Sequence, residues 1–289
     1  MGADARPEVG VGLIVFLVLS VLTVGPGALS AQWVSSPGEG WVDLSLFHHD
    51  TKRTFDQNGE ARTIFAEGRA VTTSIFLTGT VGVWRGVDLW VDLPFHRLRF
   101  DNAGGERRSV GVGDPRLFVR AGPELVGLPA WPVAVRGGMK LDGGQFDVDA
   151  EIIPLGEGQR DWELLLEVGR SFHPLPLWTM GWVGYRWRQE NVEARRTPGN
   201  ERFWWWSLGG EVGPVGWRAS LEGLSGDPWT LEGGIRLPST RRALHQVFLD
   251  LDHPVGPGRI RLGARMPFSG RNLPAGPALT TGYFLRWGG

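Results

Sequence analysis

The chain has 289 residues, of which 42% are hydrophobic and 21% are charged, so an intrinsically disordered protein is excluded. Its net charge is −1 and its 30 Lys and Arg residues form no basic block, which argues against a nucleic-acid-binding protein. The absence of cysteine excludes disulfides and thiolate metal sites. The 44 Gly and 15 Trp suit strands, tight turns and water–lipid interfaces.

The first 31 residues have the pattern of a secretory signal peptide. Leu13–Val24 is an apolar run that follows Arg6 and stops at a Gly-Pro-Gly break, and it is too short for a transmembrane helix. The small residues that follow predict cleavage before Ala31 or Gln32, with a retained anchor helix as the alternative. No later segment is apolar for long enough to form a membrane-spanning helix. The mature chain, residues 32–289, therefore spans a membrane only if it is a β-barrel.

From residue 40 onward, apolar residues alternate with charged ones over segments as long as a tilted barrel strand, roughly 9 to 11 residues. This period places the apolar face of each strand toward lipid and the charged face toward the lumen. Acidic and basic pairs alternate from strand to strand, so opposite charges would face one another. The charged residues predicted to line the lumen are Asp88, Asp92, Arg116, Arg120, Arg136, Lys140, Glu163, Glu167, Arg186, Arg188, Arg218, Glu222, Arg261 and Arg265.

Tryptophans and turn lengths predict how the two ends of the barrel differ. Trp84, Trp131, Trp178 and Trp217 lie within two residues of short turns, and Trp287 lies near the chain end. Short turns and chain ends belong on the periplasmic side, so these five tryptophans are predicted to form a girdle at one membrane interface. Tryptophans in the core of a soluble β-sandwich are the alternative, although they would not gather beside turns on one side. Longer polar connections, predicted to be external loops, cover residues 50–60, 101–110, 143–160 and 190–201.

The number of strands follows from the same pattern. A bacterial single-chain barrel closes on an even number of strands, and the evidence is weakest between residues 223 and 258. We therefore predict one domain with an all-β fold, a transmembrane antiparallel up-and-down barrel of about 12 strands, with 14 as the alternative. The thirteen candidate segments are residues 40–49, 70–84, 87–100, 112–125, 131–142, 161–173, 177–190, 202–213, 216–224, 228–237, 244–253, 258–267 and 279–287.

Four segments, which occur in order along the mature chain, carry a resemblance to a known family. They are VDLWVDLPF at 87–95, GVGDPRL at 111–117, PLGEGQRD at 154–161 and GRNLPAG at 270–276. Together they resemble the outer-membrane barrels known as the MetA-pathway of phenol degradation transporters, which are distantly similar to fatty-acid and toluene uptake channels. The resemblance implies an outer-membrane barrel for passage of hydrophobic or aromatic compounds, without catalytic residues. The chain departs from the usual ending by adding Gly288-Gly289 after Trp287.

The remaining motifs give little support for an enzyme or a cofactor site. The Gly111–Asp114 element precedes a strand pattern instead of a helix, which predicts a bend with Asp114 hydrogen-bonded inside its own turn. His48 and His49 are adjacent in a strand and point to opposite faces, so they are poor co-ligands for a metal. Ser171 and His173 share a face but lack a third catalytic group. We expect no enzyme activity, cofactor or metal.

Two functions remain open. The first is a passive outer-membrane channel for small hydrophobic or aromatic compounds, which would enter near Phe95, Phe100 and Phe146 and leave sideways or through a narrow gap. The second is a non-conducting structural or partner-binding barrel whose inner charges neutralise one another. The expected partners are the lipid bilayer, a small hydrophobic ligand and the outer-membrane assembly machinery of a Gram-negative-type cell, which would recognise the closing segment 280–287.

Overall fold

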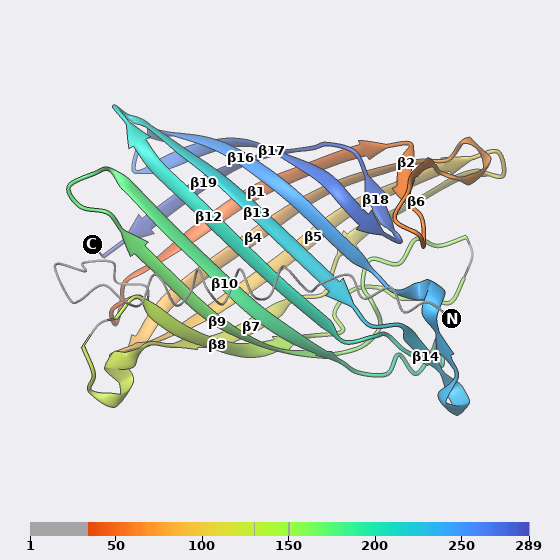
Figure 1. The fold of residues 1–289 in the computed structure, drawn as a ribbon, viewed down its shortest axis with the longest axis horizontal. Coiled ribbons are helices and arrows are strands. Elements are labelled where there is room, and N and C mark those ends of the chain that lie inside the picture. The colour runs from red at the N-terminus through yellow and green to blue at the C-terminus, as the bar shows by residue number, and fades with distance from the viewer. Residues whose placement is uncertain (1–33, 130, 150, 289) are drawn as a thin grey trace, which may run out of the picture.

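The computed structural model describes residues 34–129, 131–149 and 151–288, and its long strands form a closed antiparallel barrel (Figure 1). The predicted signal peptide, residues 1–31, lies outside the described residues. Within the described ranges, no helix is long and apolar enough to cross a membrane.

Twelve strand positions make up the barrel wall in the described part of the chain, and β6 and β7 together fill one of them by pairing with successive parts of β5. The number of strands predicted from the sequence is therefore confirmed. The wall strands are β1 (Gly40–Thr51), β4 (Arg69–Trp84), β5 (Val87–Asn102), β6 (Gly105–Val112), β7 (Arg116–Ala121), β8 (Val133–Lys140), β9 (Asp161–Ser171), β10 (Leu177–Arg188), β12 (Glu201–Val212), β13 (Val215–Gly226), β16 (Ala243–Val255), β17 (Gly258–Arg271) and β19 (Ala278–Trp287).

Three pairings close the wall. The first strand, β1, pairs with the last strand, β19, from Gly40 opposite Trp287 to His49 opposite Ala278. On its other edge β1 pairs with β4, and β4 pairs with β5, which joins the two ends of the sheet. The predicted closing segment is thus the last strand of the barrel, and the predicted all-β fold class is confirmed.

The thirteenth candidate segment, residues 228–237, is not a wall strand. It forms β14 (Trp229–Leu231) and β15 (Arg236–Leu237), which make a small sheet with β11 (Arg196–Thr197). Gly233 and Gly234 have φ angles of 82° and 81°, so the backbone turns in the left-handed region and the strand stops after three residues. The alternation of this segment reflects a short hairpin in the connection between β13 and β16.

The segment around residues 101–125 also differs from its prediction. Residues 101–110 were expected to be a loop, but β5 and β6 pair from Phe95 opposite Val112 to Asn102 opposite Gly105 as a hairpin. The expected single strand over 112–125 is interrupted between β6 and β7, because Pro115 has no N–H to donate to a ladder. Its last part is a short 3-10 turn, Pro123–Val126.

The two ends of the barrel are different. Most of the short connections and the C-terminus lie at one end, on the left in Figure 1, whereas most of the longer connections lie at the other end. The longer connections form the β11–β14–β15 sheet and a second small sheet, in which β2 (Arg53–Phe55) pairs with β3 (Ala61–Thr63) and β18 (Leu273–Ala275). We refer to these ends as the turn end and the loop end.

Candidate functional site

The strand register places all fourteen of the charged residues predicted for the lumen on the inner face of the wall. Directly paired residues in antiparallel strands point to the same face, and Asp88, Arg120 and Arg136 lie opposite one another in three adjacent strands. Asp88 is fully buried, whereas its neighbour Leu89 is 44% exposed on the outer face. These charged side chains therefore share the face of the wall opposite to the exposed apolar residues.

Near the loop end, the inner charges form a network around Lys140. Its Nζ lies 2.6 Å from Glu157 Oε2, 3.0 Å from Asp161 Oδ2 and 3.2 Å from Asp114 Oδ2. Arg188 extends the network, with its Nη2 2.5 Å from Glu157 Oε1 and its Nη1 3.5 Å from a Glu201 oxygen. Lys140 is almost fully buried, so its charge depends on these carboxylates and not on water.

Asp114 anchors the connection between β8 and β9 to this network. Its carboxylate accepts hydrogen bonds from the Gly144 N–H at 3.0 Å and from the Glu157 N–H at 2.8 Å. A Cβ atom on Gly156 would lie 2.2 Å from Asp114 Oδ1, so only glycine allows this approach. The prediction that Asp114 bonds within its own turn is wrong, because both partners belong to a different loop. Residues 143–158, which we call the anchored loop, thereby reach the inward-facing charges.

Glu157 is the residue of the anchored loop that meets the most positive charges. Partial burial opposes its ionisation, but Arg188, Lys140 and Arg242 outweigh that effect and hold the pKa of this carboxyl well below its usual range. Arg242, in the connection before β16, lies 3.5 Å from Glu157 Oε1. Glu157 therefore joins side chains of β8, β10 and the β13–β16 connection in one charged cluster.

Near the turn end, a second group of inner charges centres on Asp88. Arg120 Nη2 lies 2.6 Å from Asp88 Oδ2, and Arg120 Nη1 lies 3.4 Å from Glu167 Oε2. Arg136 Nε lies 2.8 Å from the other oxygen of Glu167. The Ser35 N–H also donates to Asp88 at 3.0 Å, which brings the first described residues to this end of the barrel.

Aromatic rings share the inner face with these charges. Trp41 contacts Trp90 edge-on with ring centroids 5.0 Å apart, and it lies 5.6 Å from Phe284. Trp182 and Trp205 stack with centroids 6.1 Å apart and planes inclined by 19°. These five rings are only partly buried although they point inward. The inner face therefore offers aromatic surface beside its ion pairs.

Guanidinium groups lie against several of these rings. The Arg136 guanidinium carbon is 4.2 Å from the centroid of Trp90, and that of Arg218 is 5.8 Å from Trp205. The sequence analysis missed the inner aromatics because it sorted the strands by charge alone. The signal was present, since Trp90 lies between Asp88 and Asp92 on the charged face of its strand.

The five tryptophans predicted for a girdle do not all share one face. Trp84, Trp131 and Trp287 are 68%, 55% and 41% exposed at the turn end, and the register turns Trp217 to the outer face. Trp178 is the exception. It is an even number of residues from the inward-facing Trp182 in β10, so it points to the same inner face. It packs against Gly209, where a Cβ atom would come within 2.3 Å of its ring. Proximity to a turn does not specify the face of a strand residue, and for Trp178 that criterion gave the wrong face.

The predicted entry residues are also separated. Phe95 is exposed on the outer face, Phe100 points inward and lies 4.9 Å from the Arg107 guanidinium, and Phe146 packs beside Gly158 in the anchored loop.

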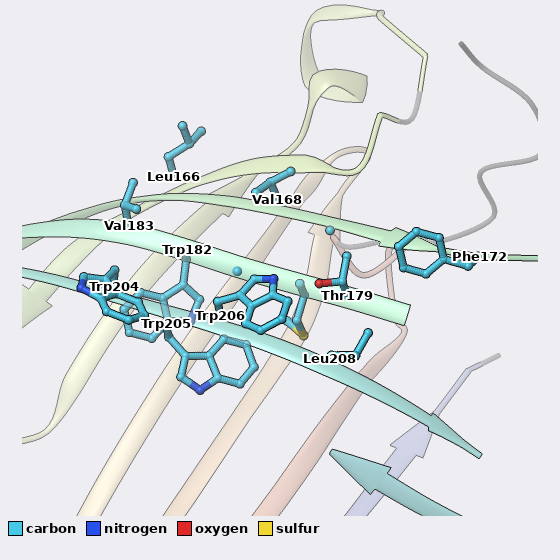
Figure 2. A pocket seen from close by; sticks show the side chains of 13 residues that line it. Leu166, Val168, Phe172, Thr179, Trp182, Val183, Trp204, Trp205, Trp206 and Leu208 are labelled. Atoms are coloured by element: carbon cyan, nitrogen blue, oxygen red, sulfur yellow. The ribbon is translucent and has the colours of Figure 1, made fainter. Parts of the chain in front are cut away.

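An apolar groove of about 220 Å³ crosses β9, β10 and β12, and Figure 2 shows its lining. On the outer face this groove runs over Gly181 and is lined by Leu166, Val168, Thr179, Val183, Trp204, Trp206 and Leu208.

Two pairs of serine and histidine come together in the wall. Ser74 Oγ lies 2.7 Å from His96 Nδ1, and His245 Nδ1 lies 3.0 Å from Ser269 Oγ. Ser74 is only 1% exposed, so its hydroxyl is not accessible to a substrate. Among the described residues, no group of three or more His, Asp or Glu side chains is arranged to hold a metal.

A solved outer-membrane channel has the same fold. An outer membrane channel from Pseudomonas putida F1 superposes with a TM-score of 0.73 at 16% identity, covering 91% of this chain and 100% of that one. The β domain of the Bordetella autotransporter BrkA has a TM-score of 0.47 at 11% identity, covering 87% of this chain and 100% of that one. The CymD monoaromatic hydrocarbon channel has a TM-score of 0.44 at 9% identity, covering 88% of this chain and 90% of that one. No protein-family model and no curated protein matches the chain. The chain has the fold of an outer-membrane channel. The barrel implied by the family resemblance is therefore confirmed.

Proposed function

We propose that this protein is a passive outer-membrane channel for small aromatic or hydrophobic compounds. The observation that carries the proposal is the set of partly buried, inward-facing rings, Trp41, Trp90, Trp182, Trp205 and Phe284. Aromatic rings stack with other rings and gain about 0.5–1.5 kcal/mol per pair beyond the burial of apolar area. A planar solute would exchange one such contact for another as it moves along the wall.

The inner charges are compatible with this role. Arg136 and Arg218 are held by carboxylates and also lie against Trp90 and Trp205, so their charges are already compensated. A compensated guanidinium presents its flat face to a passing ring without the cost of separating a free charge from water. The CymD channel is described as a monoaromatic hydrocarbon channel. That this chain transports such compounds is part of the proposal.

The test compares the stacked pair with a tryptophan on the opposite face. Cells that produce the Trp182→Ala/Trp205→Ala variant should take up a small aromatic compound about three- to tenfold more slowly than wild type, the equivalent of roughly 0.5–1.5 kcal/mol. Trp187→Ala is the matched control, because Trp187 is exposed on the outer face of β10 and lies outside the apolar groove over Gly181. Equal uptake by wild type, both variants and cells without the protein would refute the proposal.

A non-conducting barrel is the second candidate, and the burial of the charged network favours it. Asp88, Glu201 and Lys140 are each at most 2% exposed, as in a packed interior. Single-channel recording of the purified protein in a planar bilayer distinguishes the two functions. Discrete conductance steps would support the channel, whereas a silent bilayer together with unchanged uptake would support the structural role.

A further inference from the structure

A basic depression lies on the outer face of the barrel near the loop end. It has a volume of about 310 Å³ and is formed by side chains of β1, β4 and β5. His48, Thr73 and Arg97 lie opposite one another in these three strands and point away from the lumen. The His48 ring bonds to the Thr73 hydroxyl at 3.0 Å, which holds the centre of the depression. The lining residues are His48, Asp50, Arg69, Val71, Thr73, Arg97 and Arg99.

The charges in this depression are not balanced. Arg69 Nε donates to Asp50 Oδ1 at 2.8 Å, and Arg99 pairs with Asp101 at 2.9 Å and Glu106 at 2.7 Å. Arg97 is exposed, and no carboxylate of the described residues lies within ion-pairing distance of it. A guanidinium without a protein anion is a ready partner for phosphate, whose oxygens match its forked donors.

The surface next to the depression, toward the turn end, is apolar. Leu46 lies two residues before His48, Ile75 two residues after Thr73, and Phe95 two residues before Arg97. On the same outer face, these three side chains are 37%, 44% and 43% exposed, respectively. Arg97 therefore lies at the boundary between an apolar band and the polar rim of the barrel. In an outer-membrane barrel this boundary at the loop end meets the headgroups of the outer leaflet.

We propose that the depression binds a phosphorylated glycolipid of the outer leaflet. A phosphate of the headgroup pairs with Arg97, whereas Arg69 and Arg99 remain paired with carboxylates of the protein. The acyl chains run over Leu46, Ile75 and Phe95, a contact that a free phosphate ion could not use. The proposal rests on the orientation of the barrel and is independent of whether the lumen conducts.

The test measures lipid binding to the full-length mature barrel in detergent by native mass spectrometry. Diphosphoryl lipid A, phosphatidylglycerol and inorganic phosphate are titrated separately. Wild type should retain diphosphoryl lipid A, and Arg97→Gln should weaken that binding about tenfold, the loss expected for one charge-assisted hydrogen-bonded contact. The matched control is Arg202→Gln, which removes an arginine that is 62% exposed on the outer face of β12 and should leave the affinity unchanged.

The remaining outcomes overturn the proposal in distinct ways. Equal retention of phosphatidylglycerol would indicate an unspecific anionic-lipid surface, and displacement of the lipid by inorganic phosphate would indicate a free-anion site. An equal loss of lipid affinity in Arg97→Gln and Arg202→Gln would show that the lipid does not bind specifically in this depression. Heat-modifiable migration of each variant on a gel verifies that its barrel has folded before the titration.

Discussion

At the scale of single residues, the carboxylate of Asp88 gives the sharpest test of the inner ion pairs. It accepts hydrogen bonds from Arg120 Nε at 3.1 Å and from Arg120 Nη2 at 2.6 Å, and it is fully buried. Asp88→Asn keeps the shape of the side chain but leaves Arg120 without its nearest anion. We expect a loss of about 3–5 kcal/mol in the free energy of unfolding, measured by urea titration in detergent.

The control for this change is Asp50→Asn, which removes an exposed carboxylate paired with Arg69 on the outer face. An exposed pair contributes about 0–1 kcal/mol, so the stability of this variant should stay close to that of wild type. If Asp88→Asn cost as little as Asp50→Asn, the inner network would not be stabilising the wall.

The residue scale also shows what a one-dimensional pattern can predict. Period-two alternation puts Asp88 on the charged face of its strand and Arg120 on the charged face of its own, because a strand alternates its side chains whatever its neighbours are. In the register these two residues lie opposite one another. The alternation could not reveal that Lys140 in β8 forms an ion pair with Asp114, which lies in the connection between β6 and β7. Such contacts depend on how loops fold back over the rim, and no local period encodes that path.

At the scale of elements, the anchored loop is expected to depend on Asp114. Asp114→Ala removes the acceptor for the Gly144 and Glu157 N–H groups, so both amides should exchange hydrogen faster. Hydrogen-exchange mass spectrometry of residues 143–158 measures the effect. Asp149→Ala is the control, since the Asp149 side chain accepts a local hydrogen bond from the Glu151 N–H in the same loop. Unchanged protection in Asp114→Ala would show that other contacts hold the loop.

The charge of Glu157 sets the pH range over which the anchored loop stays in place. Its pKa in the folded protein lies below the ordinary glutamate value of 4.5, so its contribution to stability is fully present above that value. The contribution is lost only as the pH falls through the lower, folded pKa. Hydrogen-exchange protection of the loop, corrected for the intrinsic exchange rate, should therefore be constant from neutral to weakly acidic pH and should decrease only in strong acid. A decrease near neutrality would contradict this assignment.

Sequence patterns predicted the wall strands better than the connections. Strands such as β5 and β17 have long alternating runs, so their existence was clear although their C-terminal ends were predicted two and four residues too early. The segment that became β14 and β15 has the same alternation, but its two successive glycines turn the backbone. A period of two identifies extended chain, and pairing partners decide whether that chain joins the barrel.

At the scale of the whole molecule, stability requires a wall without free edges. Removing β19 would expose the unpaired edges of β1 and β17, because β19 lies between them. We expect the shortened protein to lose heat-modifiable migration and to aggregate on refolding into detergent. A gel that compares boiled and unboiled samples of both proteins measures this outcome, and retained heat-modifiability in the shortened form would contradict it.

The seam between β1 and β19 also bears on the order of assembly. Most wall strands pair with neighbours along the chain, whereas this seam brings Gly40 opposite Trp287. Local hairpins can form while the chain is still being delivered, but a contact of such long sequence separation carries the largest loop-closure entropy and forms late. Until then both seam strands present open backbone donors and acceptors. The interval before closure is therefore the time at which these two edges are open to pairing with other chains.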